Sequence, residues 1–449
     1  MIVMKFGGTS VESKSAIERV AGIVRDRLAQ NPVVVVSAMG KTTNKLLAIA
    51  SAAVAGDRDS ALDQLRQLRE FHAREAAGLG VDTEIEAHFS ELTELVKGLA
   101  VMGELTPRAT DAVSSYGERI SSIIVAAFFN CAGIPAAHVD SRRLIVTDHR
   151  HTQAAPLFRE TNERLQSSIP NLARRQVVVM GGFIASTEDG VTTTLGRGGS
   201  DYTASIVGAA IGADEIQIWT DVDGMLTSDP TIVPNVYRVK ACSFAEAAEL
   251  AYFGAKVLHP ATVLPAIERN IPVRILNSRR PENTGTRIVA EPPPCANAVR
   301  SIACKRNITL VNIVSTRMLM AHGFLRRIFE VFDRFETAVD MLATSEVSVS
   351  LTVDNTGALA AIREELEKFA EVSVEKDQAI VCLVGDNIRQ TPGVAAGVFS
   401  ALEGINVRMI SQGASALNIS VVVADGDVRR AVESLHREFF RNPDPTAFE

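Results

Sequence analysis

Short runs rich in valine and isoleucine alternate with longer amphipathic stretches from residue 1 to about residue 290, and this alternation limits the possible folds most. The order is typical of parallel strands joined by crossover helices that cover both faces of a sheet. Buried strands are predicted at 2–5, 33–37, 177–180, 216–219 and 272–276. Helices are predicted at about 60–100, 108–130, 201–212 and 243–258. The region is therefore predicted to form one large α/β layer structure.

The first strand leads through a Gly-rich turn into an amphipathic stretch that ends near Pro32. Ser15 and Glu18 have the spacing of a capping box, which predicts the start of a helix there. The turn itself holds Gly7, Gly8, Thr9 and Ser10.

This turn has the composition of a phosphate-binding loop. Two glycines between a strand end and a helix start let backbone N–H groups approach an anion closely. Lys5 supplies a positive charge for the terminal phosphates of a nucleotide. The alternative interpretation is a tight turn beside a solvated lysine. The rival sequence Gly40-Lys41-Thr42 lacks the first glycine of a P-loop, because Val35 stands at that position.

Two further motifs contain groups suited to anionic ligands. Gly196, Gly198 and Gly199 surround Arg197, whose planar fork suits a carboxylate, and Asp201 follows as a partner for cationic groups. The segment 219–224 follows a predicted strand, at the sheet edge where open α/β sheets bind ligands.

A proline run divides the chain. Glu291-Pro292-Pro293-Pro294 breaks both periodicities and predicts an extended linker. Beyond it, Gly323 and Gly393 each precede a helical stretch and lie 70 residues apart, which indicates an internal repeat. Each copy suits a ferredoxin-like βαββαβ unit. The predicted domains are residues 1–290, a linker at 291–298, and repeat units at 299–376 and 377–449.

Composition excludes several classes of function. The 449 residues carry a net charge of −7 without a long basic run, so neither nucleic acid nor an anionic membrane surface is an expected partner. The five cysteines are far apart and form no Cys-x-x-Cys pair, as in a reducing cytoplasm. No stretch has the roughly 18 uncharged apolar residues that span a bilayer. The expected partners are small molecules.

In sequence order, the motifs 5–11, 37–38, 117–118, 196–201, 220–221 and 253–260 resemble those of aspartokinases in the amino acid kinase family. The resemblance extends past the linker, where the repeats are similar to paired ACT domains, and is closest to the monofunctional, lysine-sensitive type. It implies a carbamate kinase-like three-layer αβα sandwich with a mainly parallel sheet, followed by two ferredoxin-like ACT domains.

The resemblance also implies a reaction. Aspartokinases use ATP with Mg²⁺ to phosphorylate the β-carboxylate of L-aspartate, giving 4-phospho-L-aspartate on the pathway to lysine, threonine and methionine. No protein nucleophile is needed, because positioning and charge neutralisation can supply most of the rate.

Residue roles follow from positions that match the family's motifs. The implied catalytic residues are Lys5, Asp201 and Lys256. Substrate-binding residues are Arg197 for the α-carboxylate, Glu118 for the ammonium, and Thr43 and Ser200 as supporting partners. Nucleotide-binding residues are Lys5, Gly7, Gly8, Thr9, Ser10, Gly198, Gly199, Thr220, Asp221, Leu226, Thr231, Lys256 and Val257. No metal ligand is assigned to the protein itself.

Two nucleotide positions depart from the family. Many relatives have tyrosine and arginine where this chain has Leu226 and Thr231. We therefore predict a higher Michaelis constant for ATP than in relatives that keep both residues. A Leu226→Tyr/Thr231→Arg variant is expected to lower that constant in steady-state assays, and unchanged ATP saturation would contradict the prediction.

The two repeat copies differ in charge. Alignment of residues 339–341 with 407–409 places Asp340 in the first copy opposite Arg408 in the second, so only the first copy suits an effector with an ammonium group. In lysine-sensitive aspartokinases, the matching positions surround the inhibitor. Here these positions are Met318, Gly323, Phe324, Leu325, Val339, Asp340, Thr344, Ser345 and Glu346.

The hypothesis is feedback inhibition by L-lysine, tested against threonine, in a homodimer or dimer of dimers formed through the ACT domains. Two other functions stay open at this point. The chain could be another ACT-regulated amino acid kinase, acting on glutamate or a nucleoside monophosphate, or a catalytically silent amino-acid sensor.

Overall fold

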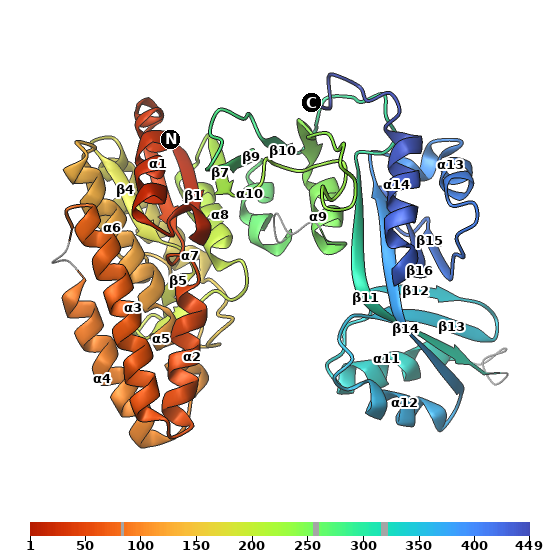
Figure 1. The fold of residues 1–449 in the computed structure, drawn as a ribbon, viewed down its shortest axis with the longest axis horizontal. Coiled ribbons are helices and arrows are strands. Elements are labelled where there is room, and N and C mark those ends of the chain that lie inside the picture. Colours follow the sequence, from red (N-terminus) through yellow and green to blue (C-terminus); the bar gives the residue numbers. More distant parts are fainter. Residues whose placement is uncertain (82–84, 255–259, 316–321) are drawn as a thin grey trace. The chain divides into compact units, whose positions relative to one another are not determined.

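A computed structural model describes residues 1–81, 85–254, 260–315 and 322–449. The chain forms two compact units, one of Met1–Met225 with Val257–Pro292 and one of Leu226–Lys256 with Pro293–Glu449 (Figure 1). The main division falls within the predicted linker, but residues 226–256 group with the second unit instead of the first. Among the predicted site residues, Lys256, Val257 and Met318 lie outside the described residues.

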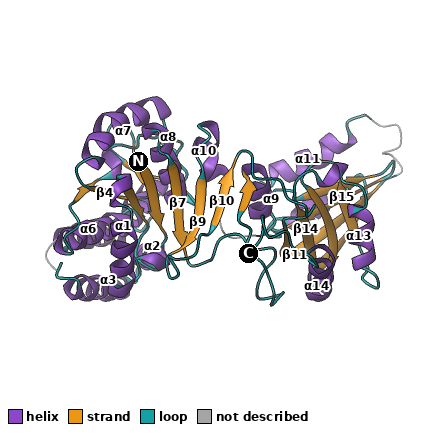
Figure 2. Ribbon diagram, turned by 90° about the horizontal axis from the view of Figure 1, so that it is seen from above, coloured by secondary structure: helices purple, strands orange, loops and turns teal. Residues whose placement is uncertain are grey.

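The first unit contains a mainly parallel sheet (Figure 2). Its strands follow the order β3-β4-β2-β1-β7-β9-β10, in which only the β9–β10 pair is antiparallel. All five residues of the central strand β1 are buried, as expected for a strand covered on both faces. The bounds are β1 Ile2–Phe6, β2 Pro32–Val36, β3 Ala136–Val139, β4 Val177–Gly181, β7 Glu215–Thr220, β9 Val273–Asn277 and β10 Thr286–Val289.

Helices cover both faces of this sheet. Ile2, Met4 and Phe6 of β1 belong to a core cluster shared with α1, α2, α3, α4 and α6. Val3 faces the opposite side, toward Gly208 of α8, and α7 packs on β4. The predicted three-layer sandwich is therefore confirmed. The bounds are α1 Lys14–Arg25, α2 Thr42–Val54, α3 Arg58–Gly78, α4 Glu86–Met102, α5 Pro107–Ser114, α6 Tyr116–Cys131, α7 Phe158–Ala173, α8 Gly199–Ile211 and α10 Leu264–Glu268.

Two local predictions were wrong in detail. The stretch 60–100 is two helices, α3 and α4, and Gly80 adopts φ +77° after the first of them. Helix α1 is capped by Ser13, whose hydroxyl accepts from Ala16 N, so the predicted box at Ser15 lies inside the helix. Ser13 supplies the same capping chemistry two residues earlier.

The described part of the second unit contains a six-stranded sheet in the order β12-β13-β11-β14-β16-β15. Helix α9, from the segment 226–256, contacts β11 and β14. The remaining bounds are β5 Ile184–Ser186 and β6 Thr192–Thr194 in the first unit, and β8 Ala241–Ser243, α9 Phe244–Tyr252, β11 Ser301–Val314, α11 Phe324–Arg334, β12 Met341–Thr344, β13 Ser348–Val353, α12 Leu359–Glu367, β14 Glu371–Val384, α13 Val394–Ala401, β15 Met409–Gln412, β16 Asn418–Ala424 and α14 Val428–Phe439 in the second.

The predicted repeat is visible in the backbone. Gly323 and Gly393 are the left-handed N-caps of α11 and α13, with φ of 79° and 85°. Strands β11 and β14 each extend through both copies, so the predicted boundary at 376/377 falls inside β14. A register shift between Lys305 and Ile308 divides β11 into two segments, and one segment belongs to each copy. Across the described residues, no helix has the length and apolar character needed to cross a bilayer.

Candidate active site and effector site

A cavity of about 280 Å³ gathers most of the predicted substrate and catalytic residues of the first unit. It lies where β1, β2 and β4 end, at the sheet edge that open α/β folds use for ligands. Seven predicted residues line it: Lys5, Thr43, Glu118, Gly198, Gly199, Ser200 and Asp201. Three others also line it: Ser37 and Gly196, which lie in motifs noted in the sequence, and Phe183, which the sequence did not single out.

Lys5 and Asp201 form an ion pair in this cavity. Lys5 is the fourth residue of β1, and Asp201 lies in the first turn of α8. Their Nζ and Oδ1 atoms are 2.7 Å apart, and only 11% and 15% of the side chains are exposed. The carboxylate therefore fixes the direction of the lysine at the helix N-terminus, where a negatively charged ligand is also favoured.

Glu118 supplies a buried carboxylate. Its neighbour Gly117 packs so closely that a Cβ there would lie 2.7 Å from Ala38 Cβ. Oε1 accepts a hydrogen bond from Ala38 N at 3.1 Å, whereas Oε2 is buried without a partner among the described residues. Burial raises the pKa of Glu118 to about 8, although the Ala38 bond and Lys5 act in the opposite direction. Such an oxygen is suited to an incoming cation.

Close backbone packing explains two glycines around the cavity. A Cβ on Gly8 would lie 2.8 Å from Gly40 O, so the first loop can pass the second only without a side chain. A Cβ on Gly182 would lie 2.6 Å from Ser200 Cβ. Gly182 follows β4 in the sequence Gly-Gly-Phe, and this Gly-rich strand end was the available signal for Phe183.

Some polar groups of the predicted phosphate loop form hydrogen bonds with other parts of the first unit. Gly7 N donates to Trp219 O at 3.1 Å. Ser10 is buried, and its hydroxyl lies 2.8 Å from that of Ser278. These two residues therefore shape the loop that follows Lys5. Thr9, between them, is half-buried.

The other predicted residues lie around or apart from the cavity. Arg197 is exposed between two glycines with positive φ and does not line the cavity. Thr220 and Asp221 lie where β7 ends, and the Thr220 hydroxyl donates to Asp221 at 3.3 Å. Leu226 and Thr231 belong to the second unit, where the Thr231 hydroxyl donates to Asp229 at 2.6 Å.

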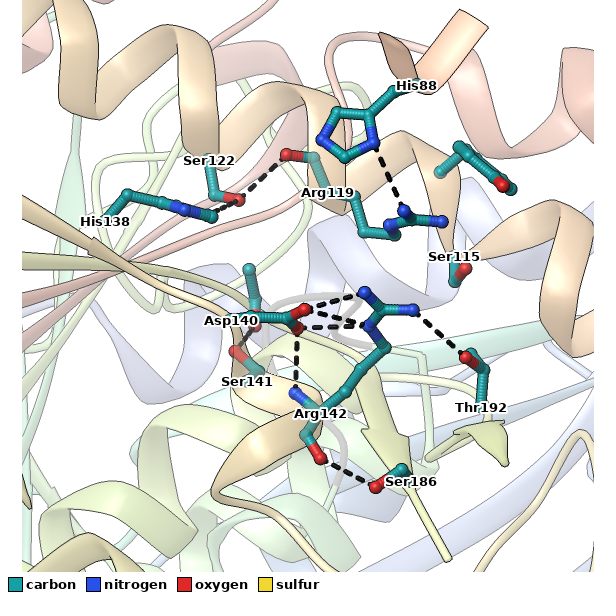
Figure 3. A network of polar contacts seen from close by, with 12 residues as sticks. His88, Ser115, Arg119, Ser122, His138, Asp140, Ser141, Arg142, Ser186 and Thr192 are labelled. Atoms are coloured by element: carbon teal, nitrogen blue, oxygen red, sulfur yellow. Dashed lines mark hydrogen bonds and ion pairs between the residues drawn. The ribbon is translucent and has the colours of Figure 1, made fainter. Parts of the chain in front are cut away.

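A polar network surrounds Asp140 and Arg142 (Figure 3). Arg142 forms a forked contact with Asp140 and donates to Thr192 at 3.2 Å, while Ser141 donates to Gly181 O. Gly181 in turn packs against Glu118, because a Cβ there would lie 3.1 Å from Glu118 Cβ. The network therefore supports the wall of the cavity that carries this carboxylate.

Helix α6 joins the same network through residues next to Glu118. Arg119 donates to His88 Nδ1 at 3.1 Å, and the Ser122 hydroxyl lies 3.0 Å from His138 Nε2 (Figure 3). Burial lowers the pKa of His88, and the nearby Arg119 adds to this effect. Arg119 thus serves the network, although it is adjacent to a substrate-binding candidate in sequence.

In the second unit, Asp340 is already in contact with a positive charge. Lys305 Nζ lies 2.7 Å from Asp340 Oδ1 and 2.8 Å from Asp354 Oδ2. Burial lowers the pKa of Lys305, but the bonds to these two carboxylates outweigh it and raise the pKa overall. Tyr252, at the end of α9, donates to Asp340 at 3.2 Å. Two carboxylates face one lysine, which leaves one negative charge to balance.

The second oxygen of Asp340 is buried and has no partner among the described residues. In the second repeat copy the charges of the corresponding ion pair are reversed. Glu375 lies 70 residues after Lys305, and its carboxylate contacts Arg408 at 3.9 Å. Among the described residues, only the first copy therefore presents a buried acidic oxygen without a partner.

The remaining described effector candidates form three groups along the chain. Gly323 precedes α11, Phe324 is buried in the core of the first copy, and Leu325 is exposed. Val339 packs against the same core. The third group is exposed at the end of β12 and in the turn to β13: Thr344, Ser345 and Glu346.

Comparisons with known proteins cover almost the whole chain. The Amino acid kinase family matches residues 1–277, and an ACT domain matches residues 381–439. Aspartokinase 1, chloroplastic, from Arabidopsis thaliana is 40% identical, over 98% of this chain and 80% of that protein. Lysine-sensitive aspartokinase 3 from Escherichia coli is 37% identical, over 98% and 99%.

A solved structure has the same fold. E. coli aspartokinase III in complex with aspartate and ADP, in its R-state, superposes with a TM-score of 0.84 and 36% identity, over 98% of this chain and all of that one. The same enzyme in complex with lysine and aspartate, in its T-state, gives the same score.

Proposed function

We propose that the cavity around Lys5, Glu118 and Asp201 is the place where ATP phosphorylates L-aspartate. The chain belongs to the amino acid kinase family and is an aspartokinase. The activity is ATP-dependent phosphorylation of the aspartate β-carboxylate, the first step of the pathway to lysine, threonine and methionine. One observation supports this choice of cavity most directly: the buried, unpaired Oε2 of Glu118 suits the substrate ammonium.

Each residue then has a distinct task. Glu118 binds the ammonium of aspartate and Arg197 its α-carboxylate, while Thr43 and Ser200 support the orientation. These contacts hold the β-carboxylate toward the γ-phosphorus, so that a carboxylate oxygen forms the new O–P bond as ADP leaves. Lys5 neutralises negative charge on the transferred group, and Asp201 keeps Lys5 in position.

Mg²⁺ is the ion we propose to accompany ATP. Carboxylate and phosphate oxygens are its preferred ligands, and Asp221 lies exposed at the end of β7 with such an oxygen. Asp221 would hold the ion together with the nucleotide phosphates. The ion supplies neutralisation of the β- and γ-phosphate charges.

A coupled assay of ADP release tests the function. Release should depend on L-aspartate, and glutamate or a nucleoside monophosphate should not replace it. A sensor without catalysis would bind amino acids but release no ADP under any of these conditions, which would reject the proposal.

Regulation by lysine is the second part of the function, and we propose that Asp340 binds the effector's ammonium through its unpaired oxygen. Tyr252 connects this carboxylate to helix α9, which lies in the sequence region matched by the kinase family. Occupation of Asp340 can therefore alter the contact between the effector site and this helix within the second unit.

An Asp340→Asn variant is expected to lose most lysine inhibition while keeping its activity without lysine. Loss of one charged contact should raise the half-inhibitory lysine concentration at least about tenfold. The matched control is Arg408→Gln, at the equivalent position of the second copy, which should leave inhibition unchanged. Equal desensitisation by both variants, or inhibition by threonine alone, would contradict the assignment.

We also propose an oligomeric state and a location. A homodimer, or a dimer of dimers, is expected through the ACT domains. A cytoplasmic location is supported by the widely spaced cysteines.

A further inference from the structure

Asp111 is a fully buried carboxylate that the sequence did not single out. It lies on the short helix α5, and its side chain has no exposed surface. A buried charge is costly unless it is paired or hydrogen-bonded, so its partners indicate what it holds in place.

Its hydrogen bonds reach two segments far along the chain. Oδ1 accepts from the Thr194 hydroxyl at 2.6 Å, and Oδ2 accepts from His151 Nδ1 at 2.7 Å. Thr152 N donates to both oxygens at 3.0 Å. One carboxylate thus joins helix α5, the turn at 151–152 and the end of strand β6.

Both of these segments lead to the wall of the active-site cavity. Gly196 follows Thr194 by two residues and lines the cavity. Its Cα is covered by the 151–152 turn, because a Cβ there would lie 3.2 Å from Thr152 O. Ala154 N also donates to Thr194 O at 2.9 Å. Gly196 and Thr152 both adopt positive φ, 74° and 72°, so the contact depends on an unusual backbone shape on each side.

We propose that Asp111 is a positioning residue for the loop Gly196-Arg197-Gly198 and thereby sets the affinity for aspartate. The inference rests on the proposed role of Arg197 as the clamp for the substrate α-carboxylate. Arg197 is exposed between two glycines with positive φ, and its side chain forms no hydrogen bond or ion pair with another described residue. The loop is instead fixed at its base, where Asp111 binds Thr194 and the turn that covers Gly196.

The test compares Thr194→Val with Thr194→Ser, in steady-state kinetics with each substrate varied. Valine keeps the shape of threonine but removes the donor to Asp111, and serine restores a hydroxyl. Thr194→Val is expected to raise the Michaelis constant for aspartate about tenfold, with kcat and the constant for ATP nearly unchanged. Thr194→Ser should restore the aspartate constant. Ser114→Ala, which alters another buried hydroxyl of α5, is the matched control and should change neither constant.

Asp111→Asn extends the test if its thermal unfolding shows a folded protein. It should raise the aspartate constant in the parent enzyme but add nothing in an Arg197→Ala background, because both changes then act on the same contact. The inference would be overturned if Thr194→Val changed the Michaelis constants for ATP and for aspartate to the same extent. It would also be overturned if Arg197→Ala raised the Michaelis constant for aspartate and Thr194→Val did not. No effect of Arg197→Ala on the aspartate constant would reject the clamp itself, and the positioning role with it.

Discussion

Replacement of Lys5 by methionine is expected to lower kcat by about a thousandfold, the upper part of the range for loss of one preorganised charge-stabilising group. Lys5 Nζ faces the cavity from the end of β1 and is held 2.7 Å from Asp201. Methionine has a similar length but carries no charge, so the negative charge of the moving phosphoryl group would lack its partner. A coupled assay at saturating ATP and aspartate measures the effect on kcat directly.

The same variant leaves the Asp201 carboxylate without its partner, and removal of one member of a largely buried ion pair is destabilising. A Lys5→Met/Asp201→Asn double variant should recover thermal stability by removing the stranded charge. It should not recover activity. Return of kcat in the double variant would show that the loss in Lys5→Met came from altered folding instead of lost charge stabilisation.

Glu118→Gln is expected to raise the Michaelis constant for aspartate at least about a hundredfold, since glutamine cannot neutralise the substrate ammonium. In the parent enzyme, the pKa of about 8 also means that the carboxyl is largely protonated at pH 7 when the site is empty. Aspartate must bind to the ionised form, so its affinity should increase from pH 6 to pH 8. This pH dependence should be absent in the glutamine variant.

Stability provides a separate test of Glu118. The folded pKa lies above the reference value of 4.5, so the folded state binds more protons than the unfolded state between pH 4.5 and 8. The contribution of Glu118 to the free energy of unfolding therefore falls as pH rises through this window. At pH 7 it is roughly 3 kcal/mol smaller than at low pH, where the carboxyl is protonated in both states. Glu118→Gln should be more stable than the parent at pH 8 but not at pH 4.5. Equal differences in unfolding temperature at both pH values would contradict the raised pKa.

Much of the active site could be predicted because a parallel sheet brings its strand ends together. Lys5, Glu118 and Ser200 are far apart in sequence, yet each has glycines within three residues that the backbone requires for close packing. These glycines are visible as Gly-rich motifs in the chain. The resemblance to a family then gave each residue a role that its neighbours alone could not specify.

The residues that hold the site in place were not visible in the same way. Asp111 appears in sequence as an ordinary helical acid, and its partner Thr194 is 83 residues away. Asp340 was singled out by its charge, but its pairing with Lys305 depends on which strands become neighbours. Such contacts are set by tertiary structure, whereas local patterns report only periodicity and turn chemistry.

The ends of helices also could not be placed from sequence patterns alone. Ser13 and Ser15 both have capping chemistry, and the choice between them depends on how the helix meets the preceding turn. The stretch 60–100 contains Gly78 and Gly80, a signal for a break that the strong helical periodicity on both sides outweighed.

The continuous strands β11 and β14 determine how this regulatory sheet could be recombined with that of another enzyme. A chimera cut at 376/377 would divide one strand and leave half of each copy with foreign neighbours. The two strands pass from one copy to the other beside Asn307 and Asp377, which both adopt left-handed backbone conformations, with φ of 59° and 56°. Exchange of the sensing copy therefore needs two junctions, one at each of these positions, so that its segments of β11 and β14 move together while the other segments stay with the second copy.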